Sequence, residues 1–416
     1  MKNYYKLLAT AVILFFVFLF SGCMKNTCNN TQTYLLYTPV YQSKAEVKAN
    51  IKSSPAREIH NPGKIYIYGN YIFLNETDKG IHIIDNTDPS SPKNISFIDI
   101  PGNLDIAVKG NMLYADMYTN LVTLDITNPL NAVVKNYNDG VFPVRMYNNY
   151  FINDTSRVIV DWTEKDSTVS QDCGDQWWQK RTYTSVAFLS GSGAAVLPTG
   201  IAGSMARFAI VNDRMYTVST SGLEIFNISS PVNPAFTNKI NTGWNIETIF
   251  PFKNNLFIGS QTGMMIYNIN DPDHPAPAGQ FGHVRSCDPV IADNNYAYVT
   301  LHSGTTCGGS INELDILQSD NLTNPQLLKS YSLSGPHGLS KDGNLLFICD
   351  GTDGLKIFDA TDLMNLKLIK QVNNLETYDV ITYNKIALVV AKDGLYQYDY
   401  SNTNNIRLLS KTGILK

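Results

Sequence analysis

Charge is scarce in this chain of 416 residues. Lys, Arg, Asp and Glu make up 16% of it, against roughly 25% in an average globular domain, and the formal net charge is only −4. The chain lacks the basic footprint of a nucleic-acid-binding protein, so we expect no nucleic acid as a partner. The hydrophobic share of 44% is too high for a disordered chain, and 24 tyrosines among many uncharged polar residues favour an all-β protein.

Motifs of catalysis and cofactor binding are also missing. The sequence has no CxxC pair and no Cys/His cluster with the spacing of a zinc site. It has no nucleophile elbow and no dinucleotide glycine fingerprint, and the small-residue stretch 190–194 lacks the lysine of a phosphate-binding loop. We therefore predict no cofactor and no metal.

Long apolar runs are absent after the N-terminus. Lys2 and Lys6 precede an uncharged stretch at 7–20, and Ser21-Gly22-Cys23 follows, which is the layout of a secretory signal. The ending at 19–23 resembles the lipobox of bacterial lipoproteins, in which the cysteine is lipidated and the chain is cut before it. The resemblance implies a signal peptide at 1–22 and a mature chain anchored through Cys23 in the bacterial cell envelope, expected at the outer membrane. The alternative is an ordinary cleaved signal peptide with a chance cysteine.

One hexapeptide pattern recurs along the chain. The first copy reads GIHIID, and others read GLEIFN, GMMIYN and GLKIFD, so that apolar residues lead to a final Asp or Asn. Successive copies start about 40 residues apart, with one larger gap after the third. Eight copies occur, at 80–85, 120–125, 156–161, 222–227, 263–268, 310–315, 354–359 and 394–399.

Each period carries the signals of four short antiparallel strands. In the seventh, an apolar run from Leu339 leads to the turn Asp342-Gly343, a second run ends at Cys349, and the hexapeptide follows. In several copies a proline four residues after the hexapeptide forces a turn before a fourth strand. Such units repeated radially predict a β-propeller over 64–416. We expect eight blades, with seven as the alternative if the insertion has displaced the third copy.

These repeats resemble the LVIVD-repeat propellers of bacterial lipoproteins. The resemblance covers about 64–416 and implies the propeller fold. It implies no particular biochemical activity, because one fold hosts many functions.

The recurring carboxylates have a structural interpretation. Each final Asp or Asn is expected to accept backbone N–H bonds two residues further on, which explains why Asn227 and Asn268 replace Asp. A catalytic or calcium-binding role is disfavoured, because carboxylates one blade apart are too dispersed to share an ion.

Two segments lie outside the repeats. The stretch 23–63 is expected to be a tether with a short helix, since Ser43 and Glu46 have the spacing of a capping box. The insertion at about 164–203 contains Trp177 and Trp178. These two side chains either bind a glycan or a protein, or cover the third blade as a local core.

The blade pattern also predicts a candidate binding site. The polar residue that starts the first strand of each blade is expected at one mouth of the central channel, together with His302 from a loop on the same face. This set forms either a site for a polar ligand or partner loop, or a hydrated lining of the channel. Its other members are Lys64, Asp105, Arg145, Arg207, Glu247, Asp288, His337 and Asp379.

Histidines and cysteines gather near the same predicted face. His302 and His337 are expected as separate, solvent-facing side chains. The alternative is a metal-binding cluster of these two with His283, beside Asp288. Cys287 and Cys307 are predicted to form a disulfide, since an exported protein meets oxidising conditions. The alternatives are two free thiols or a competing bond to Cys349.

These observations lead to one leading functional hypothesis. We expect a non-enzymatic, monomeric, lipid-anchored propeller that recognises a protein or a glycan in the cell envelope. The alternative is an enzyme, a hydrolase or a lyase, that uses polar residues at the channel mouth.

Overall fold

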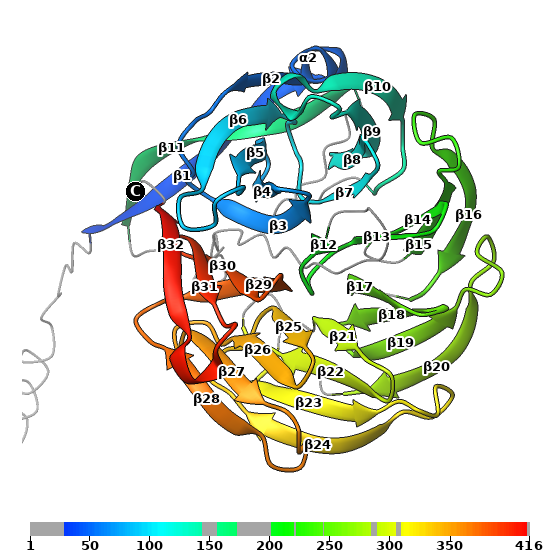
Figure 1. Cartoon of the computed structure of the whole chain (residues 1–416). Helices are drawn as coiled ribbons and strands as arrows, with labels where there is room; N and C mark the ends of the chain where they lie inside the picture. Colours follow the sequence, from blue (N-terminus) through cyan, green and yellow to red (C-terminus); the bar gives the residue numbers. More distant parts are fainter. Residues whose placement is uncertain are drawn as a thin grey trace, which may run out of the picture. The chain divides into compact units, whose positions relative to one another are not determined.

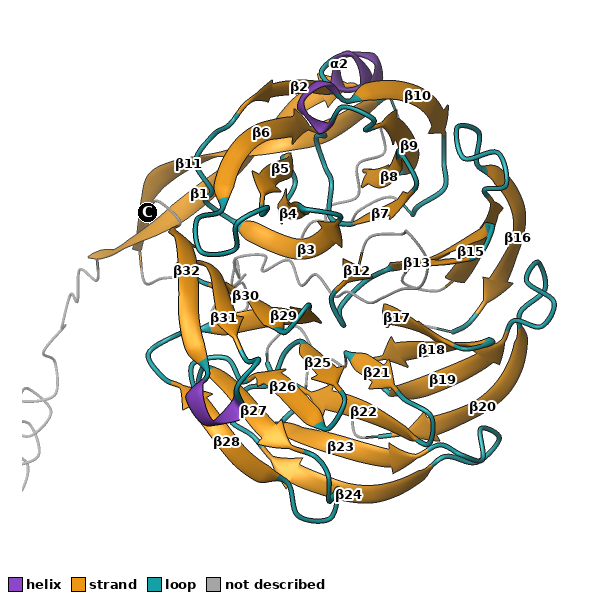
Figure 2. Ribbon diagram, in the orientation of Figure 1, coloured by secondary structure: helices purple, strands orange, loops and turns teal. Residues whose placement is uncertain are grey.

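The computed structural model describes residues 29–143, 156–172, 201–219, 222–243, 245–283, 289–304 and 309–413. They divide into two compact units, one within Met1–Tyr41 and Asp161–Thr184 and the other within Gln42–Val160 and Ser185–Lys416. Strands make up nearly all of the regular structure (Figure 2). Among the described residues, no helix is long and apolar enough to cross a membrane.

The smaller unit is built on two long strands. β1 (Asn29–Ser43) pairs with β11 (Arg157–Asp172) in a two-stranded sheet. Two threonine contacts tie the strands together: the hydroxyls of Thr33 and Thr168 lie 3.1 Å apart, and the Thr163 hydroxyl donates to the Thr38 carbonyl at 3.2 Å. The third copy of the hexapeptide, at 156–161, therefore lies at the start of β11 and contributes no strand to a blade.

The larger unit is a propeller of seven blades, each with four antiparallel strands (Figure 1). The expectation of eight blades was wrong and the seven-blade alternative is confirmed, because the strand after the third copy pairs with β1. The strands of blades 1 to 3 are β3 (Pro62–Tyr68), β4 (Tyr71–Glu76), β5 (Gly80–Asp85) and β6 (Lys93–Asp99); β7 (Ile106–Lys109), β8 (Met112–Met117), β9 (Asn120–Asp125) and β10 (Val133–Asn138); and β13 (Phe208–Val211), β14 (Arg214–Val218), β15 (Gly222–Asn227) and β16 (Ala235–Asn241).

Blades 4 to 7 continue the ring in chain order. Their strands are β17 (Ile246–Phe252), β18 (Asn255–Ser260), β19 (Gly263–Asn268) and β20 (Ala276–Gly282); β21 (Val290–Ala292), β22 (Tyr296–Leu301), β23 (Glu313–Gln318) and β24 (Gln326–Ser332); β25 (Leu339–Asp342), β26 (Leu345–Cys349), β27 (Leu355–Asp359) and β28 (Lys367–Val372); and β29 (Thr377–Tyr383), β30 (Ile386–Ala391), β31 (Gly394–Asp399) and β32 (Arg407–Gly413). Two 3-10 turns, η1 (Pro129–Asn131) and η2 (Thr403–Asn405), precede the outer strands of blades 2 and 7.

The hexapeptide forms the third strand of each blade. Its register is as expected in six blades, but in blade 5 the strand is Glu313–Gln318, three residues later than the predicted copy. The Asx interpretation is confirmed where the strand ends in Asp or Asn. For example, the Asp85 carboxylate accepts the Thr87 N–H at 2.9 Å, and the Asn227 side chain accepts the Ser229 N–H at 2.9 Å. Hydrogen bonds from Thr87 also hold the pKa of Asp85 below its usual value.

The apolar core lies between the blades. Seven buried clusters occupy the described structure, one at each junction of neighbouring blades. The ring closes in the same way, because Ile65 and Ile72 of blade 1 pack with Leu388 and Val390 of blade 7. Each blade takes its four strands from its own stretch of chain, so closure depends on side-chain packing.

Two additions extend blade 1. β2 (Lys52–Pro55) pairs with the outer edge of β6, and the short helix α2 (Lys44–Ala49) precedes it. The predicted capping box is present: the Ser43 hydroxyl accepts the Glu46 N–H at 3.2 Å, and the Glu46 carboxylate accepts the Ser43 N–H at 2.7 Å. Val47 joins the cluster between blades 1 and 2, so the helix packs on the propeller.

A segment from 201 to 207 connects the inner strands of several blades. β12 (Ile201–Ala202) pairs with β3 of blade 1, and the Ser204 hydroxyl accepts the Leu339 N–H of blade 6 at 2.8 Å. The Ala206 carbonyl accepts the Ile249 N–H of blade 4, and the Arg207 N–H donates to Asp105 at the start of blade 2. β12 lies among the inner strands (Figure 1). This segment therefore lies against the inner strands, whose polar residues were expected to line an open channel mouth.

Candidate functional site

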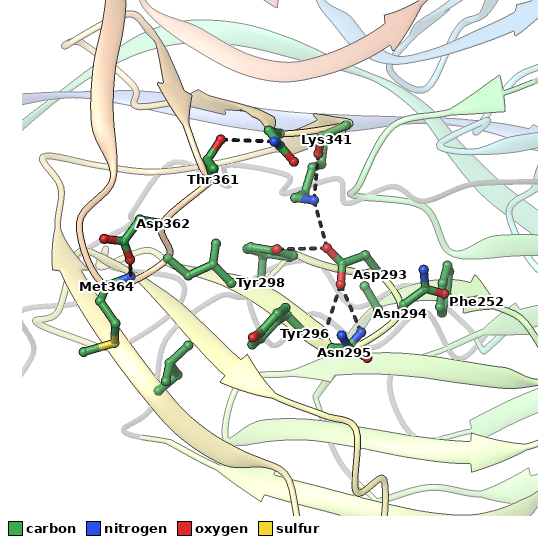
Figure 3. A pocket seen from close by; sticks show the side chains of 15 residues that line it. Phe252, Asp293, Asn294, Asn295, Tyr296, Tyr298, Lys341, Thr361, Asp362 and Met364 are labelled. Atoms are coloured by element: carbon green, nitrogen blue, oxygen red, sulfur yellow. Dashed lines mark hydrogen bonds and ion pairs between the residues drawn. The ribbon is translucent and has the colours of Figure 1, made fainter.

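A pocket of about 840 Å³ lies between blades 5 and 6. It is built on the face where the first and second strands of each blade turn, opposite to the face that carries His302 and His337. The β21–β22 turn contributes Asp293 to Tyr296, blade 6 contributes Lys341 and the loop that contains Met364, and Phe252 comes from blade 4 (Figure 3).

Asp293 is the best-connected side chain of this pocket. Its carboxylate accepts the N–H groups of Asn295 and Tyr296 at 3.2 and 3.1 Å, the Tyr298 hydroxyl at 2.9 Å and the Lys341 ammonium at 2.8 Å. Burial by itself would raise the pKa of Asp293, but the bonds to Lys341 and to the Asn295 N–H lower it overall. Asp293 is therefore an ionised, fully engaged carboxylate.

Lys341 is also fully engaged. Besides Asp293, its ammonium donates to the Gly343 carbonyl at 2.8 Å and lies 5.4 Å from the centre of the Tyr298 ring. Its side chain is only 18% exposed. The two opposite charges of the pocket thus satisfy one another.

The junction of blades 5 and 6 lacks a contact that two other junctions have. In blades 2 and 3, the tyrosine at the third position of the second strand donates to a proline carbonyl of the next blade: Tyr114 to Pro231 at 2.8 Å, and Tyr216 to Pro272 at 2.9 Å. Blade 6 has Leu363 at this proline position, and the Leu363 carbonyl accepts the Tyr331 hydroxyl instead. Tyr298, the equivalent tyrosine of blade 5, bonds to Asp293 in its own blade.

Ion pairs between turns occur at other junctions on this face. Lys109 pairs with Asp213 between blades 2 and 3, and Arg214 bonds Asp273 through two nitrogens, both at 2.6 Å, between blades 3 and 4. The Asp293–Lys341 pair belongs to this series and at the same time lines the pocket. It holds the walls of the site in place.

Three members of the predicted channel-mouth set are buried. Lys64, Asp105 and Asp379 are 4%, 2% and 3% exposed. The Lys64 ammonium lies 2.9 Å from an Asp105 carboxylate oxygen, which also accepts the Arg207 N–H at 2.6 Å. Burial lowers the pKa of Lys64, and the attraction of Asp105 opposes this shift. These side chains hold the inner strands and segment 201–207 together and do not line an open funnel.

The remaining members of the predicted set are dispersed or not described. Glu247 is half-buried and accepts a hydrogen bond from the Gln261 amide at 2.9 Å. Arg145 and Asp288 lie outside the described residues, as do Cys23, Cys287, Cys307, Trp177 and Trp178. The anchor, the disulfide and the binding role of the insertion stay predictions.

His302 and His337 are brought together rather than lying apart as expected. Their ring centres are 4.3 Å apart, and the edge of Tyr378 lies against His337 at 5.7 Å. Burial lowers the pKa of His337 to about 4, and repulsion from His302 adds to this shift. Within the part of the chain that the structure describes, no three His, Cys, Asp or Glu residues gather to hold a metal.

Sequence reasoning missed the pocket between blades 5 and 6. The predicted channel-mouth site lies on the opposite face, where the first strand of each blade begins. Loss of the proline four residues after the hexapeptide does not mark the pocket, because it occurs at Leu363 next to the pocket and also at Thr403 in blade 7.

Fold and repeats define the class of this protein as a seven-bladed β-propeller. The sequence pattern of the LVIVD repeat matches residues 62–98 and 103–139, which correspond to blades 1 and 2. The chain therefore carries LVIVD repeats, as the sequence resemblance implied. No curated protein matches the sequence significantly.

Several solved structures share the propeller architecture. A protein from Lactobacillus plantarum is 12% identical, with a TM-score of 0.53 over 85% of this chain and 97% of that one. The computationally designed protein Ika8 is 11% identical, with a TM-score of 0.52 over 86% of this chain and 89% of that one. The periplasmic gluconolactonase PpgL of Pseudomonas aeruginosa is 10% identical, with a TM-score of 0.51 over 85% of this chain and 96% of that one. At such low identity these likenesses establish the fold alone.

Proposed function

We propose that this protein is a non-enzymatic recognition propeller of the bacterial cell envelope, anchored to the outer membrane through Cys23, that binds a protein or a glycan in the pocket between blades 5 and 6. The observation that carries the proposal is the state of the charged groups in that pocket. The Asp293 carboxylate accepts four hydrogen bonds, and the Lys341 ammonium is shared between Asp293 and Gly343. Groups held in this way shape a rigid binding surface and are poorly placed to transfer protons.

The alternative, a hydrolase or a lyase, has its best candidate in the imidazole of His337. A pKa of about 4 keeps this ring neutral at pH 7, so it can accept a proton, but it also makes the ring a weaker base than an ordinary histidine. If the protein is such an enzyme, His337→Gln abolishes turnover of its substrate and Tyr296→Ala leaves turnover intact. The recognition proposal expects the opposite: ligand binding survives His337→Gln and is weakened by Tyr296→Ala.

Crosslinking in the living cell tests the proposal with whichever ligand the cell supplies. A photo-reactive amino acid placed at Asn295 of the full-length protein reports what lies in the pocket. Asn70 is the matched control, because it occupies the same turn position in blade 1, and both backbone carbonyls accept an N–H from the end of the third strand. We expect an adduct of defined mass from position 295 that is absent from position 70. Equal labelling at both positions overturns the proposal.

The anchor is tested separately by metabolic labelling with a fatty-acid analogue. The wild-type protein is expected to be labelled and to fractionate with the outer membrane, and the Cys23→Ser variant is expected to do neither. A labelled Cys23→Ser variant contradicts the lipoprotein assignment.

A further inference from the structure

The chemistry of the pocket narrows its ligand further, and this inference rests on the recognition function proposed above. Lys341 is the basic side chain of the pocket, and its ammonium is held by Asp293, by the Gly343 carbonyl and against the Tyr298 ring. An anionic ligand gains little from a cation that is already paired, and displacing Asp293 leaves a half-buried carboxylate without its partner. The pocket is therefore poorly suited to phosphate, sulfate or carboxylate groups.

A second acidic residue also disfavours the binding of anionic ligands. Asp362 lies at the exposed rim of the pocket, where its carboxylate accepts the Met364 N–H at 2.9 Å and the Asn365 side-chain amide at 2.9 Å. These bonds lower the pKa of Asp362, with the Asn365 amide as the larger cause. Among the residues that line the pocket, the formal charges are those of Asp293, Asp362 and Lys341, which leave one excess negative charge.

The rest of the lining combines neutral hydrogen-bonding groups with apolar surface. The exposed amides are those of Asn294, Asn295 and Asn344, and Tyr296 adds a half-buried ring. Phe252 and Met364 supply apolar surface at two walls (Figure 3). Amides beside an aromatic ring match a sugar, which presents hydroxyl groups at its rim and C–H groups on its face.

The size of the pocket also favours a small occupant. Its volume of about 840 Å³ lies in the range of roughly 300–1,000 Å³ that holds compact ligands. A stable protein partner usually covers about 800 Å² of surface on each side, mostly outside any single pocket. We propose that the pocket between blades 5 and 6 binds an uncharged saccharide and discriminates against anionic ones.

Defined oligosaccharides test this proposal. The neutral probes are N-acetylglucosamine trisaccharide and maltotriose, and the anionic probe is galacturonic acid trisaccharide, each titrated calorimetrically into the anchor-free protein that starts after Cys23. We expect a neutral probe to bind at least about tenfold more tightly than the anionic one at low salt. Tyr296→Ala should weaken that binding about tenfold. Tyr71→Ala, which changes the equivalent position in blade 1, should leave the affinity within about twofold.

The Asp362→Asn variant tests the effect of the carboxylate charge at the rim of the pocket. Asn stands at the equivalent loop position in blades 2 and 7, where Asn128 and Asn402 accept the same N–H bond two residues on, so the loop tolerates this change. The variant should bind the anionic probe at least about threefold more tightly at low salt and the neutral probe unchanged. An Asp362→Asn variant that treats both probes alike shows that the rim carboxylate does not select the ligand.

The outcomes separate this inference from the recognition function. If position 295 crosslinks to a protein, the saccharide assignment is wrong and recognition stands. If the anionic probe binds as well as the neutral ones, the selection for uncharged saccharides is wrong and recognition stands. If position 295 gives no specific adduct and none of the three probes binds, both proposals fail.

Discussion

The Ser204 hydroxyl accepts a hydrogen bond from the Leu339 N–H at 2.8 Å, although the two residues lie 135 positions apart. Ser204 belongs to segment 201–207, and Leu339 starts the first strand of blade 6. With β12 on blade 1 and Arg207 on blade 2, this bond makes the segment a connection between blades that are not neighbours.

Loss of this connection should reduce stability. Ser204→Ala removes the acceptor of a buried N–H, and we expect the free energy of unfolding to fall by about 1–3 kcal/mol. Ser229→Ala changes an exposed serine and should stay within about 0.5 kcal/mol of the wild type. Urea unfolding of the anchor-free protein measures both, and equal values would show that segment 201–207 adds nothing to stability.

The Lys64–Asp105 pair should behave as a buried ion pair. Lys64→Met leaves the Asp105 carboxylate buried without its partner and should cost about 3–5 kcal/mol. Adding Asp105→Asn removes the stranded charge and keeps an oxygen for the Arg207 N–H, so the double variant should recover at least half of the loss. Lys385→Met breaks an exposed pair with Asp342 and should cost less than about 1 kcal/mol.

A double variant of Lys64 and Asp105 that is no more stable than Lys64→Met would contradict this account. In that case packing of the lysine stem, and not pairing of charge, would explain the effect of the single substitution.

His337 should make the protein sensitive to mild acid. Its pKa of about 4 in the folded state lies below the ordinary value of 6.5, mainly because of burial. The unfolded chain therefore binds more protons than the folded chain between these two values, and the folded state loses stability as the pH falls through this window. The loss is of the order of 3 kcal/mol and is complete only below pH 4.

A pH series of urea unfolding measurements tests this dependence. His302, Tyr378, Asp350 and Glu376 surround the ring or act on its charge, so the informative quantity is the difference between wild type and His337→Gln. That difference should change between pH 6.5 and 4 and stay constant above pH 7. His274→Gln, at an exposed histidine, is the control, and a His337 variant with the same pH profile as the control would refute the prediction.

Cys287 and Cys307 are expected to be joined in the exported protein. A closure of about twenty residues stabilises the fold by roughly 3 kcal/mol. Cys349, the competing partner in this prediction, is buried in the structure. Peptide mapping without reduction should recover the 287–307 crosslink. Three alkylatable thiols at 287, 307 and 349 would show that the bond does not form.

Much of the fold could be predicted from local sequence signals. The hexapeptide period predicted repeated four-stranded units, because apolar alternation and turn residues act within a few positions of one another. The Asx bonds of Asp85 and Asn227, and the capping box of Ser43 and Glu46, were predictable for the same reason.

Three features were decided by contacts between distant parts of the chain. The copy at 156–161 has the pattern of a blade strand, yet it leads into β11, which pairs with β1 more than a hundred residues away. Lys64 and Asp105 lie near the start of inner strands, where polar residues were expected to face an open channel mouth. Both are buried instead, and segment 201–207 bonds to Asp105 through the Arg207 N–H. The pocket combines the Asp293 turn of blade 5 with Lys341 and the Met364 loop of blade 6, which lie far apart in the sequence. Sequence alone thus determined which residues form strands and turns, since those preferences are local. The number of blades, the position of segment 201–207 against the inner strands and the place of the pocket depend on contacts between residues far apart in the sequence. Only the tertiary structure decides those contacts.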